Sequence, residues 1–267
     1  MNSLRKEIGM KFSVVNRDDE FSLEMKELLT DVLIRHHWTL DEKDPELVIC
    51  VGGDGTLLRA LHRYIDVLDH VLFVGLHTGT LGFLADYTVS EIDMFISDLL
   101  SESYSVESSH LLEMQMDTTD KVFYALNDIR IGSFAESVNF EIYIDGEFFE
   151  QTSGSGICIS SQVGSSAANR TLGGAVVDNG IEVIELTEIM PLVNKNHHSL
   201  LNPYIMNIDR EIRVHTLKAY GGLEVSYDHL TMPNCPGRTF RIRTSEKKVR
   251  FARFRPYSYL KRLKNIY

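Results

Sequence analysis

Apolar residues in the first hundred positions of the chain follow two alternating spacings. Short runs that are apolar throughout are typical of buried strands, whereas apolar residues at every third or fourth position indicate helices. Because the two kinds of segment alternate, we expect a parallel sheet covered by helices, with ligands bound at the carboxyl ends of its strands. The predicted strands are Lys11–Val15, Glu46–Val51 and His70–Leu76, and the predicted helices are Phe21–His36, Thr56–Tyr64 and Ser90–Leu100.

The pattern changes after about Ser101, where short segments rich in β-branched and aromatic residues follow one another. Asp145-Gly146 and Gly221-Gly222 lie between pairs of these segments and predict hairpin turns. One helical stretch, roughly Ser166–Gly174, interrupts them. We therefore expect an α/β domain over residues 1–100 and a β-rich, antiparallel, sandwich-like domain over residues 101–267. The second domain ends in a basic tail, which could fold back to pack on the first domain. The predicted strands are Leu111–Met116, Val122–Ile131, Val138–Ile144, Gly156–Ser161, Ile212–Leu217, Leu223–Tyr227, Thr239–Thr244 and Lys248–Phe254.

Composition narrows the class of protein. Of the 267 residues, 43% are hydrophobic and 24% are charged, a balance typical of a folded globular protein. Cys50, Cys158 and Cys235 lie far apart without CxxC spacing, so they predict neither a disulfide framework nor a zinc knuckle and fit a reducing compartment. No apolar run approaches the length needed to cross a bilayer, and the first residues lack a signal-peptide core. We expect a cytoplasmic protein with no membrane partner.

Charge is distributed unevenly along the chain. The formal net charge of −11 argues against a dedicated nucleic-acid-binding protein, because such proteins neutralise phosphates with lysine and arginine. Between Arg238 and Tyr267, however, eleven basic residues accompany one acidic residue, Glu246. A nucleic-acid arm is one interpretation. Because apolar and aromatic residues alternate with the arginines, we favour a structural tail that packs against acidic surface of its own chain or of a neighbouring subunit, and we expect no nucleic-acid partner.

The most informative motif is GGDGT at Gly52–Thr56, directly after one predicted strand and directly before a predicted helix. The glycines Gly52, Gly53 and Gly55 let the backbone approach a ligand closely, and the helix N-terminus adds a partial positive charge, so phosphate is the expected ligand. Asp54 is unusual there, since a carboxylate repels phosphate unless it binds a metal ion or takes up a proton. The alternative is a tight turn in which Asp54 caps the helix. The strand–loop–helix placement favours the ligand site.

Two further clusters rich in glycine and hydroxyl groups follow predicted strands. Gly75–Phe83 would lie at the same sheet edge as the GGDG loop, where it could close over a nucleotide, and Ser160–Gly174 leads into a predicted helix in a way that suits phosphate or ribose. A flexible loop and a serine-capped helix are the alternatives on spacing alone. The chain has no P-loop, dinucleotide-binding glycine fingerprint, HExxH or GxSxG sequence. His36-His37 and His197-His198 lack metal-ligand spacing and are expected at the surface.

Taken in order, these motifs resemble those of the NAD kinases over nearly the full chain, in particular the short NAD kinases of Gram-positive bacteria. GGDG alone is shared with diacylglycerol kinases, sphingosine kinases and 6-phosphofructokinases, whereas the ordered set is much more specific. The segments that carry the resemblance are Gly52–Leu58, Gly75–Phe83, Leu126–Asp128, Gly154–Gly156, Gly164–Gly174 and Val249–Pro256.

The resemblance implies an enzyme with an α/β amino-terminal domain, a β-rich carboxyl-terminal domain and an active site between them. It implies phosphoryl transfer from ATP, or in some members polyphosphate, to the adenosine 2′-hydroxyl of NAD, with Mg²⁺ held mainly through the donor phosphates. It further implies a homodimer or homotetramer whose acceptor pocket borrows residues from a neighbouring subunit. Asp54 matches the family's proposed general base. The residues expected to bind nucleotide are Gly52, Gly53, Gly55, Phe83, Asn127, Asp128, Ser155, Ser166, Ala167, Ala168, Asn169, Arg170 and Thr171.

The sequence departs from the family pattern at several positions. Ser153 and Ser155 stand in place of an arginine and an aspartate. Ala168 stands in place of an aromatic residue expected to stack on a base, and Thr80 in place of a common histidine. Loss of one stacking aromatic costs ~1–3 kcal/mol in proteins that bind nucleic-acid bases. Two alternatives therefore stay open: a non-catalytic or weakened dinucleotide-binding paralogue, and a GGDG-containing kinase with a different acceptor.

Overall fold

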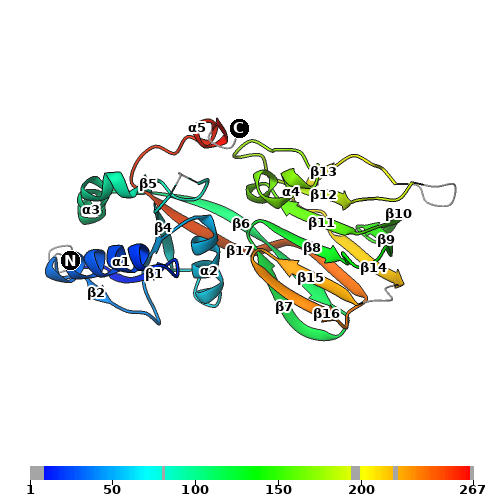
Figure 1. Ribbon diagram of the computed structural model, residues 1–267, viewed down its shortest axis with the longest axis horizontal. Helices are drawn as coiled ribbons and strands as arrows, with labels where there is room; N and C mark the ends of the chain where they lie inside the picture. The colour runs from blue at the N-terminus through cyan, green and yellow to red at the C-terminus, as the bar shows by residue number, and fades with distance from the viewer. Residues whose placement is uncertain (1–8, 80–81, 194–198, 219–221, 265–267) are drawn as a thin grey trace. The chain divides into compact units, whose positions relative to one another are not determined.

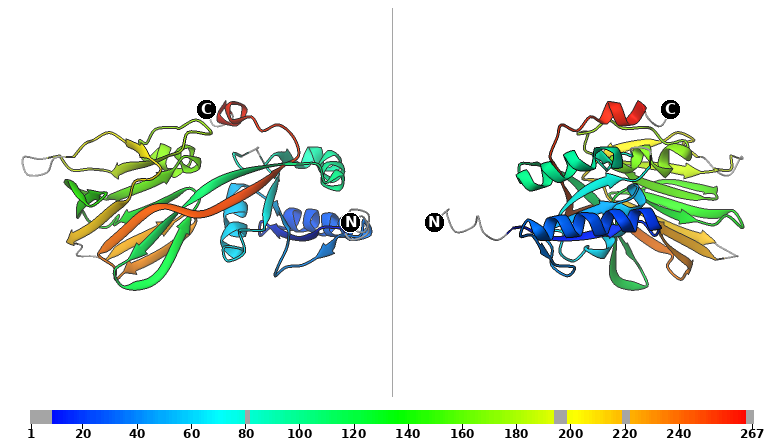
Figure 2. Two further views of the ribbon diagram at one scale, coloured as in Figure 1. Left: turned by 180° about the vertical axis from the view of Figure 1, so that it is seen from behind. Right: turned by 60° about the vertical axis from the view of Figure 1, so that its left-hand side comes forward.

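The computed structural model describes residues 9–79, 82–193, 199–218 and 222–264 (Figure 1). The chain forms two compact units, one made of Met1–Ser109 with Lys248–Tyr267 and the other of His110–Lys247. It passes between them within two long paired strands, β6 (Ser105–Met116) and β17 (Thr239–Arg253) (Figure 2). The sequence predicts a boundary at residues 100–101, whereas in the structure the first unit extends to Ser109 and includes the last part of the basic tail, Lys248–Tyr267.

The first unit is built on a parallel sheet with the strand order β2-β1-β3-β4, as the alternating pattern predicts. The short strand β5 and the end of β17 both pair with β4 in parallel. The strands are β1 (Lys11–Asn16), β2 (Thr39–Leu40), β3 (Leu47–Val51), β4 (Leu72–His77) and β5 (Tyr87–Thr88). The helices are α1 (Glu20–Arg35), α2 (Asp54–Arg63), α3 (Ile92–Ser101) and α5 (Tyr259–Lys264), with a 3₁₀ turn, η1, at Val89–Glu91. The elements β2, β5, η1 and α5 are not among the predicted ones.

Apolar side chains of the parallel strands form the core of this unit together with one stripe of α1 and of α3. Leu29 and Leu33, four residues apart on α1, and Phe95 and Leu99, four residues apart on α3, are fully buried in that core. Burying one such side chain stabilises a fold by roughly 1.5–3 kcal/mol. Strand β3 is buried along its whole length, so the residues that follow it start from the edge of a rigid sheet.

The second unit consists of two antiparallel sheets that share one apolar core, which confirms the predicted β-rich fold. One sheet has six strands in the order β13-β12-β11-β8-β15-β16, and the other contains β10, β9, β14 and the first part of β17, together with β6 and β7. Core side chains come from both sheets, such as Phe140 and Val214 from one and Ile129 and Val225 from the other. The strands are β7 (Thr119–Ala125), β8 (Asp128–Gly132), β9 (Val138–Ile144), β10 (Glu147–Gly154), β11 (Gly156–Ser161), β12 (Val183–Ile189), β13 (Tyr204–Asn207), β14 (Ile212–Lys218), β15 (Leu223–Tyr227) and β16 (Leu230–Cys235), with the short helices η2 (Val163–Ser166) and α4 (Ala168–Thr171) between β11 and β12.

The predicted strand Val122–Ile131 is in fact two strands, β7 and β8, which belong to different sheets. The carboxylate of Asp228 accepts hydrogen bonds from the N–H groups of Leu126 (2.8 Å) and Asn127 (2.7 Å). These two donors are therefore taken out of the strand ladder, and the chain changes sheets at this point. The prediction of one continuous strand was wrong because its apolar pattern carries no sign of this distant carboxylate.

Other boundaries also differ from the predictions. The segments Thr239–Thr244 and Lys248–Phe254 belong to the single strand β17, since the polar residues between them stay extended. The helix expected over Ser166–Gly174 is shortened to α4, which ends ahead of Gly173 at φ +94°. Strands β10, β12, β13 and β16 are not among the predicted ones, although the alternation in V-I-E-L-T-E-I of β12 could have revealed it.

The two predicted hairpin turns have different outcomes. Asp145 (φ +51°) and Gly146 (φ +84°) connect β9 to β10, which pair antiparallel, so the first turn is confirmed. The second prediction is wrong, because β14 and β15 lie in different sheets and do not form a hairpin. Gly221 itself lies outside the described residues.

Candidate active site

The GGDG loop connects β3 to α2 at the carboxyl edge of the parallel sheet. Gly52 has φ +155°, and a Cβ atom there would lie 2.2 Å from the Oγ1 of Thr56, so no side chain fits. Gly53 is the N-cap of α2, and a Cβ atom added at Gly55 would meet no atom within 4 Å. Because the first N–H groups of a helix lack partners within it and carry partial positive charge, this loop presents donors suited to phosphate.

Asp54 is half-buried at the first position of α2, and a second loop holds its carboxylate. Oδ2 accepts a hydrogen bond from the N–H of Phe83 (2.9 Å), and Oδ1 accepts one from the N–H of Leu84 (3.1 Å). Gly82 packs against the same group, since a Cβ atom there would lie 2.4 Å from Oδ1. The cap of α2 is Gly53, without a side-chain cap bond, so the alternative in which Asp54 caps its own helix is wrong. The structure thus joins two of the predicted clusters around one carboxylate.

His77, at the end of β4, contacts both of these loops. Its Nδ1 accepts a hydrogen bond from the N–H of Gly79 (2.9 Å), and a Cβ atom added at Gly53 would lie 3.4 Å from its Nε2. His77 lies in the segment Gly75–Phe83, which carries part of the family resemblance, but it is not among the predicted site residues. Its position at the carboxyl end of a strand next to β3 is the signal that could have identified it. Thr80, the position of a common family histidine, lies outside the described residues.

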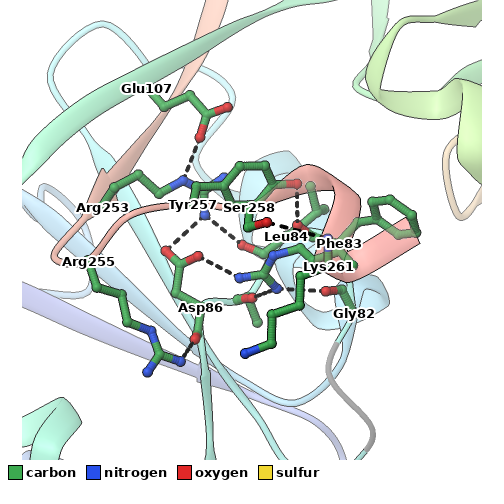
Figure 3. A network of polar contacts seen from close by, with 12 residues as sticks. Gly82, Phe83, Leu84, Asp86, Glu107, Arg253, Arg255, Tyr257, Ser258 and Lys261 are labelled. Carbon is green, nitrogen blue, oxygen red and sulfur yellow. Dashed lines mark hydrogen bonds and ion pairs between the residues drawn. The ribbon is translucent and has the colours of Figure 1, made fainter. Parts of the chain in front are cut away.

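A buried network of opposite charges supports the loop that binds Asp54 (Figure 3). Asp86 is 2% exposed, and its carboxylate oxygens contact Arg253 at 3.0 Å and Arg262 at 2.8 Å. Arg253 also pairs with Glu107 at 2.6 Å. The basic tail therefore packs against acidic residues of its own chain, which is one of the two arrangements that the sequence left open.

In the second unit, the predicted acceptor residues Asn127 and Asp128 lie where β8 begins. Asp228, in the turn between β15 and β16, fixes this point through its bonds to the backbone. Asp128 is buried, and its Oδ1 lies 2.8 Å from the Nε of Arg130. Burial raises the pKa of Asp128 to about 6, with Arg130 opposing the shift and Asp228 adding to it. A carboxyl group that changes charge near neutral pH is a functional-site candidate, and Asp228 is a supporting residue that sequence reasoning missed.

The turn η2, which leads into the stretch from Ser166 to Thr171, packs against the residue that precedes β8. A Cβ atom added at Gly164 would lie 2.0 Å from the carbonyl oxygen of Asn127, so only glycine permits this contact. The structure therefore places η2, directly ahead of α4, next to the predicted acceptor residue Asn127. Ser166 is buried, Ala167, Ala168 and Arg170 are half-buried, and Thr171 is exposed.

Asn169 and Arg170 differ in how their side chains are used. Asn169 is fully buried, its Nδ2 donates to Glu185 (2.9 Å), and its Oδ1 accepts from the hydroxyl of Thr187 (2.8 Å). The amide is thus committed to contacts inside the protein. The buried Nε of Arg170, by contrast, has no hydrogen-bond partner among the described residues. Arg170 thus places a cationic side chain on α4 with one buried donor that the described residues do not satisfy.

Ser155 lies at the tight junction between β10 and β11. Its N–H donates to the carbonyl of Ile189 (2.9 Å), and its hydroxyl lies 3.8 Å from the Sδ of Met190. A Cβ atom at the following residue, Gly156, would lie 2.7 Å from the carbonyl oxygen of Ile131. The strands pack so closely here that the glycine is required, and the Ser155 hydroxyl faces an exposed methionine.

Within the described ranges, no group of three or more His, Cys, Asp and Glu side chains is arranged to hold a metal ion. His36 and His37 are exposed, as expected, and His197 and His198 lie outside those ranges. In the same part of the chain, no helix is long and apolar enough to cross a membrane.

Family models and solved structures both match the chain. The model of the ATP-NAD kinase N-terminal domain matches residues 6–104, and that of the ATP-NAD kinase C-terminal domain matches residues 126–254. Yeast NADH kinase complexed with NADH superposes with a TM-score of 0.80 at 18% identity, over 96% of this chain and 86% of that chain. An NAD kinase from Archaeoglobus fulgidus in complex with ATP gives a TM-score of 0.73 at 21% identity, over 96% of this chain and 97% of that chain. These two structural similarities show the fold of this chain.

Curated relatives are similar to the chain over nearly its full length. NAD kinase 1 of Bacillus subtilis (strain 168) is 35% identical over 262 residues, which cover 97% of this chain and 98% of the relative. NAD kinase 1 of Bacillus anthracis is 34% identical over 266 residues, with the same coverage, and the NAD kinase of Latilactobacillus sakei is 32% identical over 262 residues, or 97% of each chain. Because the two domain models match most of the chain and these relatives exceed 30% identity, the chain belongs to the NAD kinase family.

Proposed function

We propose that this protein is an NAD kinase, a phosphotransferase that moves a phosphoryl group from ATP, or from polyphosphate, to the adenosine 2′-hydroxyl of NAD. The observation that carries the proposal is the Asp54 carboxylate, which two backbone N–H groups fix beside the donor-rich start of α2. Family membership supports it. The two superposed structures, a complex with NADH and a complex with ATP, are consistent with these substrates.

Asp54 is the proposed general base. It accepts the proton of the 2′-hydroxyl while that oxygen forms a bond to the terminal phosphorus of the donor. The bond from this phosphorus to the bridging oxygen breaks, so ATP yields ADP, NAD yields NADP, and the proton resides on Asp54. Each carboxylate oxygen of Asp54 accepts one N–H, which leaves lone pairs for the proton. The backbone of Gly52, Gly53 and Gly55 binds phosphate oxygens, where donors fixed in advance stabilise the transferring group.

The residues proposed to bind the acceptor belong mainly to the second unit. With a pKa of about 6, Asp128 is mostly ionised at pH 7 and accepts hydrogen bonds from ribose hydroxyls. The guanidinium of Arg170, which is half-buried on α4, pairs with a phosphate of the dinucleotide. Asn169 acts as an internal brace, because its amide is used by Glu185 and Thr187. The further proposed contacts are made by Asn127, Ser155, Ser166, Ala167, Ala168 and Thr171, with Phe83 from the first unit.

A divalent ion, which we propose to be Mg²⁺, fits these residues as a cofactor that the substrate carries. Both oxygens of Asp54 already accept N–H bonds, which suits a base better than a ligand in a protein-built metal cage. When bound, the ion supplies positive charge to the donor phosphates.

We also propose a homodimer or homotetramer in a reducing, cytoplasmic setting, with neither nucleic acid nor membrane as a partner. Phe134, Met190 and Val193 leave large apolar side chains exposed on the second unit, which favours contact with another subunit. Three buried, unpaired cysteines suit a reducing compartment. Arginines of the tail are paired within their own chain, which leaves fewer of them for phosphates. Light scattering on the purified protein measures the assembly.

A coupled assay with purified protein, ATP, Mg²⁺ and either NAD or NADH tests the proposed function. We expect phosphorylation by the unaltered protein and a ~10²–10⁴-fold lower turnover in Asp54→Asn, the range that a positioned base supplies. The amide keeps the size of the carboxylate and still accepts an N–H bond, so NAD affinity measured by calorimetry should stay within about tenfold. Full activity in Asp54→Asn would remove the residue from the base role.

Two other outcomes would reassign the protein. Binding of NAD without turnover would identify a non-catalytic paralogue. Phosphorylation of a lipid or sugar in place of NAD would identify a kinase with a different acceptor. Ser155 and Ala168 motivate both alternatives, but the family comparisons favour neither.

A further inference from the structure

Five consecutive backbone carbonyl groups, from Gly82 to Asp86, each accept a hydrogen bond from a side chain of the carboxyl-terminal tail (Figure 3). We name Gly82–Asp86 the aspartate loop, and the side chains of Arg253, Arg255, Tyr257 and Arg262 the tail clamp. Between 169 and 180 residues separate the partners in sequence. The pairs are Arg262 to Gly82 (2.7 Å) and to Ala85, Tyr257 to Phe83 (3.0 Å), Arg253 to Leu84 (3.1 Å), and Arg255 to Asp86.

The two peptide groups that bind Asp54 are also held by the tail clamp. In the Gly82–Phe83 peptide, the carbonyl accepts from Arg262 and the N–H donates to Asp54 Oδ2 at 2.9 Å. In the Phe83–Leu84 peptide, the carbonyl accepts from Tyr257 and the N–H donates to Asp54 Oδ1 at 3.1 Å. Because the C=O and N–H of a trans peptide point to opposite sides of a rigid plane, each plane is held between a clamp donor on one side and the carboxylate on the other.

The tail clamp is itself fixed in place, since two of its arginines are buried beside one carboxylate. Arg253 and Arg262 are 7% and 6% exposed, and the carboxylate of Asp86 lies between them. Both guanidinium groups lie over the ring of Tyr257, with the Cζ of Arg253 4.3 Å and the Cζ of Arg262 4.8 Å from the ring centroid. Burial raises the pKa of Tyr257 to about 12, so its hydroxyl stays protonated and donates. Locked side chains of this kind hold a functional group in one geometry.

We infer that Tyr257 and Arg262 are positioning residues for phosphoryl transfer, because through the aspartate loop they fix the orientation of the Asp54 carboxylate. The inference rests on the proposed function, in which Asp54 takes the proton of the acceptor. A reacting group misplaced by about 1 Å can lose 10²-fold in rate. Neither residue is among the groups that bind substrate in the proposed reaction. Their loss should therefore lower kcat and leave KM nearly unchanged.

A merely structural role for the tail clamp makes a different prediction. Loss of a structural brace lowers the fraction of folded protein, and this reduces the rate equally whether or not Asp54 is present. Loss of a positioning contact matters only while Asp54 acts as the base. The two roles therefore separate in a double-mutant cycle with Asp54→Asn.

The informative variants are Tyr257→Phe, which removes the hydroxyl and keeps the ring, and Arg262→Gln. The control is Lys261→Gln, which removes an exposed cation from the same helix. We expect kcat to fall roughly two- to tenfold in Tyr257→Phe, the equivalent of one hydrogen bond, and further in Arg262→Gln. KM for NAD and for ATP should change less than about twofold, and the control should behave as the unaltered protein.

In the Asp54→Asn background, neither substitution should lower the residual rate further. Equal losses in both backgrounds, or a change confined to KM, would overturn the inference. Thermal melting shows whether each variant is folded. If Arg262→Gln does not fold, Tyr257→Phe alone still tests the inference.

Amide hydrogen exchange tests the contact independently of the reaction. Exchange of the Phe83 and Leu84 amides should be roughly two- to tenfold faster in Tyr257→Phe than in the unaltered protein or in Lys261→Gln. Unchanged exchange would overturn the inference, whichever acceptor the enzyme uses. If exchange is faster in Tyr257→Phe but the unaltered protein does not phosphorylate NAD, the contact between the tail clamp and the aspartate loop is supported. In that case only the proposed function is rejected.

Discussion

Asp86 joins two buried arginines, and Asp86→Asn tests how the first unit is held together. The carboxylate is 2% exposed and contacts Arg253 and Arg262, which are 7% and 6% exposed. Asparagine keeps the shape of the side chain and removes its charge. Arg253 keeps Glu107 at 2.6 Å, but Arg262 loses its one carboxylate partner within the described part of the chain. The substitution therefore leaves one guanidinium buried without an opposite charge.

The expected cost follows from that unpaired charge. Removing one partner of a buried ion pair typically costs 3–5 kcal/mol, because the remaining charge is uncompensated. Since Arg253 stays paired, we assign this cost of about 3–5 kcal/mol almost entirely to Arg262. A domain is typically stable by only ~5–15 kcal/mol, so the midpoint of unfolding should fall clearly.

Urea unfolding followed by tryptophan fluorescence measures this change in the first unit, because the single tryptophan, Trp38, is 4% exposed in its core. Addition of Arg262→Met to Asp86→Asn should recover much of the loss, since an apolar side chain carries no charge to desolvate. Asp41→Asn, which breaks an exposed pair with Lys11, is the control and should barely move the midpoint. A loss below about 1 kcal/mol in Asp86→Asn, or additive losses in the double variant, would refute the reasoning.

Three other positions give measurable outcomes. Ala168→Tyr adds the missing aromatic face and should lower KM for NAD roughly ten- to hundredfold in steady-state kinetics; a raised KM would instead show that the half-buried site is already filled. Gly82→Ala places a methyl group 2.4 Å from Asp54 Oδ1, so kcat should fall by roughly 10²-fold, and an unchanged kcat would contradict the contact. The folded pKa of Asp128, about 6, lies above its unfolded value, so its contribution to stability is full below the unfolded pKa and is lost as pH rises through 6. The stability of Asp128→Asn relative to the unaltered protein should therefore rise by about 2 kcal/mol from pH ~4 to ~7 in urea titrations, and a constant difference would count against the shift.

Local patterns in the sequence were enough to predict the setting of Asp54. An apolar run, three glycines and an amphipathic segment follow one another without interruption, and they become β3, the GGDG loop and α2. The Asp145-Gly146 turn was predictable for the same reason, because left-handed backbone conformations favour these two residue types. The ordered motifs likewise identified the family, since they depend only on the order of residues along the chain.

The partners of these residues were decided by the tertiary structure alone. Asp228 breaks the strand at Asn127 from 101 residues away, and the tail clamp reaches Gly82 across 180 residues. Hydrogen bonds and ion pairs between such distant residues leave no period in the sequence. Asp86 and Arg262 look like ordinary surface charges until the fold buries them together. A charged side chain gains its role only when folding removes water and supplies its partner, so the residues that hold Asp54 in place could be found only in the folded chain.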